Sequence, residues 1–178
     1  MTPGPVVLVG HSFGGLAITN AGNADNVAAL VYISAFAPDD NQSIAELGAN
    51  FAPLPSAKAF IFDAQGRFWL SHDDFLKYFA PDVPKAQANL MAAVQGPADG
   101  ARFEWRSGPA AWKKKPSYFL VSEHDQIISP ELEAWEAKNI KAVKTVSVPG
   151  ASHAALVSHP DIVANLIIDA AKAVAAKS

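Results

Sequence analysis

The 178-residue chain contains no cysteine, which excludes a disulfide-stabilised scaffold and a thiol nucleophile. Only 17% of its residues are charged and the net charge is −3, so no basic field exists to attract nucleic acid. The short run Lys113 to Lys115 is interpreted as a solvated turn. No run approaches the roughly 18 apolar residues of a membrane span. No cluster has metal-ligand spacing and no phosphate-binding loop is present. We therefore expect no cofactor, no metal, no nucleic-acid partner and no membrane partner.

The most informative segment lies at residues 10–14, which read Gly-His-Ser-Phe-Gly. The preceding run, Pro5 to Val9, is short, apolar and rich in β-branched residues, which is typical of a strand buried on both faces. Leu16 to Ile18 begin a stretch compatible with a helix. A serine at such a strand-to-helix turn can adopt a strained backbone that lifts its Oγ clear of the sheet. The pattern predicts that Ser12 is a nucleophile.

Three neighbours of Ser12 have predicted roles. Gly10 and Gly14 would leave room for the tight crossing of strand and helix. The N-terminus of the helix would face negative charge that develops at Ser12, and the N–H of Phe13 would form half of an oxyanion hole. A Gly-x-Ser-x-Gly pattern also occurs as an ordinary glycine-rich turn. Its interpretation here therefore depends on partners further along the chain.

Two strands in the last third of the chain are followed by an acid and a base. The apolar run Ser117 to Ser122 precedes Asp125, and the run Lys144 to Val148 precedes His153. In open parallel sheets, functional groups gather beyond the carboxyl ends of the strands. The order serine, acid, histidine is the one expected for this nucleophile turn. We predict that His153 takes the proton from Ser12 and that Asp125 fixes the tautomer of the imidazole.

Other residues compete for these roles. Asp39 or Asp40, at the end of the predicted strand Val27 to Phe36, could supply the acid instead of Asp125. His124 could supply the base, although it would share a loop with the acid. The other three histidines are given other roles. His11 is interpreted as a packed or pocket-lining residue, His72 as a solvated residue, and His159 as part of the start of the last helix.

Three segments resemble the second half of an α/β-hydrolase-fold protein. VVLVGHSFGGL resembles the nucleophile segment of that superfamily, HDQIISPELEAW its acid loop, and VPGASHAALVSHPDIVANLI its histidine loop and final helix. The last two are most similar to small esterases related to plant methylesterases and hydroxynitrile lyases, and to their bacterial relatives. The middle of the chain matches poorly.

The resemblance implies an α/β fold with a mostly parallel sheet, flanking helices and an inserted helical cap. It implies a serine hydrolase that cleaves a small carboxylic ester through an acyl-enzyme on Ser12, with a small-molecule ester as its partner. Two alternatives stay open. The same fold could perform hydroxynitrile lyase or acyl-transfer chemistry, or the chain could be a ligand binder or an inactive fragment.

The alternation of strands and helices divides the chain into two parts. Residues 1–37 and 113–178 alternate regularly and are predicted to form the hydrolase core. Residues 38–112 break the alternation and are predicted to form a cap or lid. Short helical patterns occur there at about Ser71 to Phe79 and Pro84 to Gln95. The aromatic residues of this part would wall a pocket and exclude water.

Proteins of this fold carry several strands before the nucleophile turn, whereas here Ser12 lies close to the first residue. We expect an N-terminally truncated chain in which the early strands and the second oxyanion donor are absent. One such donor contributes about 2.7–4 kcal/mol to the transition state, so turnover would be slow. The uncovered edge of the nucleophile strand would favour self-association. The expected compartment is the cytoplasm, although a lost N-terminus would also remove any signal peptide.

Overall fold

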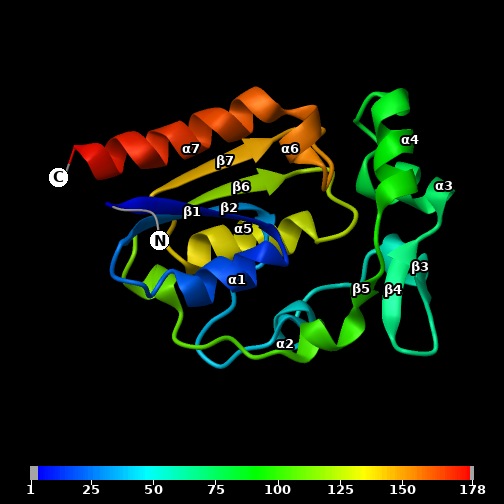
Figure 1. Ribbon diagram of the computed structural model, residues 1–178, viewed down its shortest axis with the longest axis horizontal. Coiled ribbons are helices and arrows are strands. Elements are labelled where there is room, and N and C mark those ends of the chain that lie inside the picture. Colours follow the sequence, from blue (N-terminus) through cyan, green and yellow to red (C-terminus); the bar gives the residue numbers. More distant parts are fainter. Residues whose placement is uncertain (1–3, 177–178) are drawn as a thin grey trace.

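Four parallel strands form the main sheet of the structure, a computed structural model that describes residues 4–176 (Figure 1). In spatial order these strands are β1 (Val6–Ser12), β2 (Val27–Ala35), β6 (Ser117–Ser122) and β7 (Lys144–Val148). Because all four strands run in the same direction, their carboxyl ends lie at one edge of the sheet. The segments that carry Ser12, Asp125 and His153 begin at that edge.

Helices cover both faces of this sheet (Figure 1). The helices α1 (Gly14–Ala21) and α5 (Pro130–Asn139) pack on one face. On the opposite face lies α7 (Pro160–Ala175), which follows the short helix α6 (Ala155–Ser158). The mostly parallel sheet with flanking helices is the α/β architecture predicted from the sequence.

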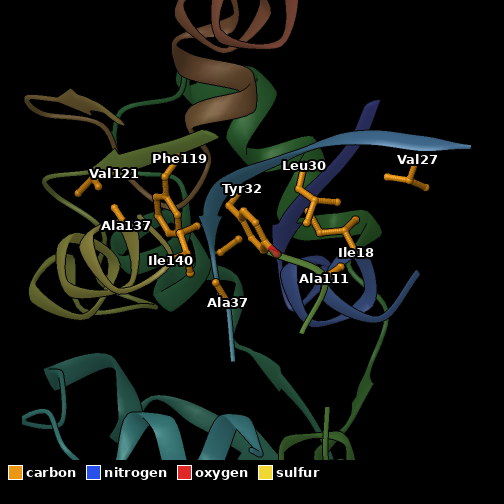
Figure 2. Packing of buried hydrophobic residues seen from close by; sticks show 11 residues of the cluster. Ile18, Val27, Leu30, Tyr32, Ala37, Ala111, Phe119, Val121, Ala137 and Ile140 are labelled. Atoms are coloured by element: carbon orange, nitrogen blue, oxygen red, sulfur yellow. The ribbon is translucent and has the colours of Figure 1, made fainter. Parts of the chain in front are cut away.

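The central strands β2 and β6 supply most of the core. Figure 2 shows Leu30 and Tyr32 of β2 and Phe119 of β6 in one buried cluster with residues of α1 and α5. The rings of Tyr32 and Phe119 stack with their centroids 5.8 Å apart. Alternate residues of the same strands, such as Val31 and Leu120, pack against α7 on the other face. These two strands are apolar on both faces because both faces are covered.

The strand β1 differs from this pattern. Val9 is 41% exposed, and Val6, Val7 and Leu8 are only partly buried. The prediction that this strand is buried on both faces was wrong for the described residues. The physical reason is its place at the edge of the sheet, where it pairs with β2 on one side only within residues 4–176.

Residues 38–112 are partly helical, as the sequence predicted. The three-residue helix α3 (His72–Asp74) continues into a π-helical turn, η2 (Phe75–Phe79), and α4 (Lys85–Val94) follows. Earlier in this part lies α2 (Ile44–Gly48), where the Ser43 side chain and the Glu46 side chain form a capping box. The remaining short helical turns are η1 (Pro55–Lys58), η3 (Gly100–Glu104) and η4 (Ala111–Lys113).

This part also contains a small antiparallel sheet that the prediction of a helical cap did not include. Its strands are β3 (Phe60–Phe62), β4 (Arg67–Leu70) and β5 (Ala98–Asp99), in that spatial order. The turn between β3 and β4 forms because Asp63 accepts backbone hydrogen bonds from Gln65 and Arg67 and because Gly66 takes a φ of +75°. The division of the chain at residues 38 and 112 stays a prediction.

Candidate active site

Ser12 lies at the end of β1 in a strained backbone conformation. Its φ is +54°, in the left-handed region that non-glycine residues rarely adopt. The pairing of β1 with β2 shifts register between His11 and Ser12, and the Phe36 N–H donates a 3.2 Å hydrogen bond to the Ser12 carbonyl. Such an outlier costs on the order of 1–3 kcal/mol and persists only where the surroundings fix it. The geometry is that of the strained strand-to-helix turn expected from the sequence.

The glycines around this turn contribute unequally. A Cβ on Gly10 would lie 2.5 Å from the Gly14 carbonyl oxygen, so the close crossing of strand and helix does require a glycine there. Among residues 4–176, a Cβ on Gly14 would meet no atom within 4 Å, so the predicted space-saving role of Gly14 was wrong for this part of the chain. The second close approach is at Gly15, where a Cβ would clash with the Phe36 carbonyl. The adjacent glycines Gly14 and Gly15 were the feature of the sequence that could have indicated this second close approach.

Phe13 is the N-cap residue of α1 and already has helical dihedral angles (φ −55°, ψ −27°). Its N–H therefore lies in the first turn of the helix, directly after Ser12. Its ring lies under the Arg102 guanidinium, whose carbon is 4.7 Å from the ring centroid. The oxyanion role of the Phe13 N–H stays a prediction.

Asp125 and His153 form a buried hydrogen-bonded pair. Asp125 Oδ2 is 2.6 Å from His153 Nδ1, and the two side chains are 0% and 1% exposed. The other oxygen, Oδ1, accepts the N–H groups of Ile127 and Ile128 at 2.6 and 2.9 Å. Burial alone would raise the pKa of Asp125, but the charge and hydrogen bond of His153 and the two N–H donors outweigh it and hold that pKa below its usual value. Asp125 is thus held ionised.

The histidine loop is fixed by residues from other parts of the chain. The Phe79 ring meets the His153 ring edge-on, with centroids 4.9 Å apart. His11 Nε2 donates a 2.8 Å hydrogen bond to the His153 carbonyl. Burial, reinforced by the charge of His153, lowers the pKa of His11 to about 4, so His11 is neutral at pH 7. Next to His153, the Ser152 N–H donates to Asp82 at 3.0 Å, a contact that the sequence gave no means of anticipating.

Ser12 and His153 line the same small cavity, which has a volume of about 140 Å³. Its walls are largely aromatic and aliphatic, and they come from the loops that follow the strands of the main sheet and from residues 38–112. The lining residues besides Ser12 and His153 are Phe13, Phe36, Phe60, Phe68, Phe79, Arg102, Phe103, Ile127 and Ile128. A larger apolar cavity of about 540 Å³ shares five of these residues: Phe36, Phe60, Phe103, Ile127 and Ile128.

The alternative acids and bases lie elsewhere. The carboxylates of Asp39 and Asp40 both pair with the Lys113 ammonium. His124 is exposed, although it directly precedes the buried Asp125. His159 lies 3.6 Å from Asp82.

Two buried glutamates on α5 were missed in the sequence. Glu133 and Glu136 are both 0% exposed, and burial raises the pKa of each well above its usual value. Glu133 accepts the Ser122 N–H at 2.8 Å, and Glu136 accepts the Ala37 N–H at 2.5 Å. Their spacing of three residues places them on one helix face, but glutamates on a helix are usually solvated, so the sequence gave no reason to expect their burial.

Within residues 4–176, no group of three or more His, Cys, Asp or Glu residues is arranged to hold a metal ion. In the same range, none of the helices combines the length and apolar character needed to cross a membrane.

Comparison with known proteins identifies the family of this chain. Residues 2–166 match the model of the alpha/beta hydrolase family. Methylesterase 2 from Arabidopsis thaliana is 22% identical over 92% of this chain, and Methylesterase 8 from the same plant is 23% identical over 92%. The chain spans 68% and 62% of these two relatives.

Solved structures agree on the fold. Polyneuridine aldehyde esterase superimposes with a TM-score of 0.78 at 16% identity, over 95% of this chain and 73% of that one. The curated methylesterases support ester hydrolysis as the general class of reaction. The chain therefore belongs to the alpha/beta hydrolase family and is an enzyme of the α/β-hydrolase type.

Proposed function

We propose that the protein cleaves a small carboxylic ester through an acyl-enzyme on Ser12, with His153 as general base and acid and Asp125 as the orienting carboxylate. The observation that carries this proposal is the 2.6 Å hydrogen bond between Asp125 and His153, whose imidazole lines the same cavity as Ser12. The strained backbone of Ser12 supports the same assignment.

The hydrogen bond to Asp125 fixes the Nδ1–H tautomer of His153 and leaves Nε2 free to accept the proton of Ser12. As that proton leaves, Ser12 Oγ forms a bond to the ester carbonyl carbon, and the Phe13 N–H stabilises the developing oxyanion. The imidazolium then gives its proton to the leaving alcohol. A water molecule, deprotonated by His153, attacks the acyl-enzyme and releases the acid.

The cavities indicate the size of the substrate. About 140 Å³ at Ser12 and His153 holds the ester group and one small substituent. Phe36, Phe60 and Phe103 line both cavities, so an apolar group on the other side of the ester would pack against these rings. The methylesterases and esterases to which the chain is similar support an ester of this kind as the substrate.

A fluorophosphonate probe tests the proposal, because it reacts covalently with an activated serine. We expect the folded chain to be labelled and to hydrolyse p-nitrophenyl acetate, and we expect Ser12→Ala and His153→Ala to lose both activities. His124→Ala, which changes an exposed histidine on the acid loop, serves as the matched control and should keep them. A folded chain that is not labelled, or labelling that survives Ser12→Ala, would contradict the proposal.

A further inference from the structure

The carboxylate of Asp125 has room for one more hydrogen bond. An ionised carboxylate accepts about four hydrogen bonds. Residues 4–176 supply three of them, from the imidazole of His153 and from the N–H groups of Ile127 and Ile128. The side chain of Glu133 on α5 lies beside Asp125, since its Oε2 accepts the Ser122 N–H while the Ser122 carbonyl accepts the Asp125 N–H at 3.1 Å. Two carboxyl groups share a hydrogen bond only if one of them carries a proton.

The surroundings of Glu133 favour a proton on that residue. Its Oε2 accepts the Ser122 N–H at 2.8 Å, whereas its Oε1 is buried and meets no donor among the described residues. An ionised Oε1 would be desolvated without compensation and would face the negative charge of Asp125. A proton on Oε1 removes the repulsion and turns the unpaired acceptor into a donor. Asp125, which already accepts three donors, is the carboxyl group that stays ionised.

We propose that Glu133 is a neutral carboxylic acid whose O–H donates to the carboxylate of Asp125, and that it thereby positions Asp125 for His153. The pair then carries a single negative charge, held on the residue that contacts the imidazole. Glu133 is a positioning residue, since it acts through Asp125. This inference rests on the proposed function for its effect on the reaction, but the hydrogen bond itself can be observed without turnover.

Several ionisable groups surround this hydrogen bond. Asp125 faces Glu133 directly, and Glu136 lies three residues further along the same helix face. Beyond Asp125 lie His153 and His11. Burial and the charge of Asp125 both raise the pKa of Glu133. When the pH rises through that pKa, repulsion replaces the hydrogen bond, so the rate at which Ser12 reacts should decline on the alkaline side of that pKa.

Two substitutions at Glu133 separate the effect of its hydrogen bonds from the effect of side-chain packing. In Glu133→Gln, the amide can still accept the Ser122 N–H and donate to Asp125, but it cannot ionise. In Glu133→Met, a side chain of similar length can neither accept the Ser122 N–H nor donate to Asp125. The matched control is Glu136→Gln, which changes a second buried glutamate on α5 whose oxygen accepts the Ala37 N–H.

The first readout is the carboxyl ¹³C resonance of Glu133 in glutamate-labelled protein, assigned by its loss in Glu133→Gln. We expect it to stay at the protonated position from pH 5 to pH 8, while exposed glutamates titrate near pH 4.3. The second readout is the Nδ1 proton resonance of His153, which should move in Glu133→Met and stay in place in Glu136→Gln. A Glu133 carbon that titrates with the exposed glutamates would overturn the inference.

The third readout is the rate of fluorophosphonate labelling as a function of pH. Glu133→Met should react about tenfold more slowly, the effect of losing one hydrogen bond to a charged group. Glu133→Gln should keep the rate near neutral pH and lose the alkaline decline, and Glu136→Gln should keep the decline. Equal rates and pH profiles for the Gln and Met variants would overturn the positioning role. If Ser12 were not labelled while Glu133 stayed protonated, the proposed function would fail and the Glu133–Asp125 hydrogen bond would stand.

Discussion

The two halves of the candidate site are held in different ways. The side chains of Asp125 and His153 are almost completely buried, and they follow the central strand β6 and the edge strand β7. Ser12 ends the other edge strand, β1, and is itself only half-buried. The acid–base half is fixed by dense packing and by several hydrogen bonds. The nucleophile half depends on one neighbouring strand and on glycines that let the backbone pass closely.

The acid–base half should show the largest effect. Asp125→Asn keeps the shape but favours the wrong imidazole tautomer, so we expect kcat for p-nitrophenyl acetate to fall by about 10⁴-fold. Asp40→Asn alters the rival carboxylate, which pairs with Lys113, and should leave kcat within about twofold. Steady-state kinetics on both variants makes the comparison. If Asp40→Asn abolished activity and Asp125→Asn did not, the acid would be misassigned.

Substitution of the glycines around Ser12 should destabilise the nucleophile half to different extents. Gly10→Ala would force a Cβ against the Gly14 carbonyl, so we expect a loss of about 2 kcal/mol or more in the free energy of unfolding, together with loss of labelling at Ser12. Gly14→Ala places its Cβ in open space inside a helix and should leave stability unchanged or raise it by about 0.5–1 kcal/mol. Urea unfolding measures both changes. Equal destabilisation by the two variants would refute the unequal roles of these glycines.

The hydrogen bond from His11 to the His153 carbonyl joins the two halves, and its contribution to stability should depend on pH. The folded state lowers the pKa of His11 from its ordinary value of 6.5 to about 4, so folding stabilises the neutral form of His11. This contribution is complete above pH 6.5 and is lost as the pH falls through 4. We expect the loss of this contribution to remove about 3 kcal/mol from the free energy of unfolding over that range. In His11→Leu this part of the acid dependence should vanish, whereas His124→Ala, in an exposed position, should keep it.

The edge of β1 should show the smallest effect on stability. Val9 is 41% exposed, so Val9→Lys should change the free energy of unfolding by no more than about 0.5 kcal/mol. A lysine on an edge strand opposes strand-to-strand association. Sedimentation velocity should therefore show less self-association in this variant than in the parent chain. An unchanged distribution of species would place any self-association on another surface.

The sequence predicted best what local patterns determine. The strand at Ser117–Ser122 begins and ends where its apolar run does, because a buried parallel strand is apolar on both faces. The strand at Lys144–Val148 also has the predicted bounds, although most of its residues are exposed at the edge of the sheet. The chain order of Ser12, Asp125 and His153 reflects the fixed order of the strand ends that carry them. The catalytic roles of these three residues stay a prediction.

The features that the sequence did not reveal depend on contacts between distant segments. The burial of β1 depends on what lies beside it, and the carboxyl group of Glu133 is buried because α5 packs against the end of β6. The Gly15 contact with Phe36 joins the helix after Ser12 to the end of the second strand. No periodicity within a single segment encodes such contacts.

The most direct test of the account is to identify the covalent intermediate. The chain is mixed with p-nitrophenyl acetate, quenched in acid within the first turnover, digested and mapped by mass spectrometry, with Ser12→Ala treated in parallel. We predict an acetyl group on the peptide that contains Ser12, and its absence from the variant. An acetyl group elsewhere, or hydrolysis by the parent chain with no acetylated Ser12 at any quench time, would contradict the account.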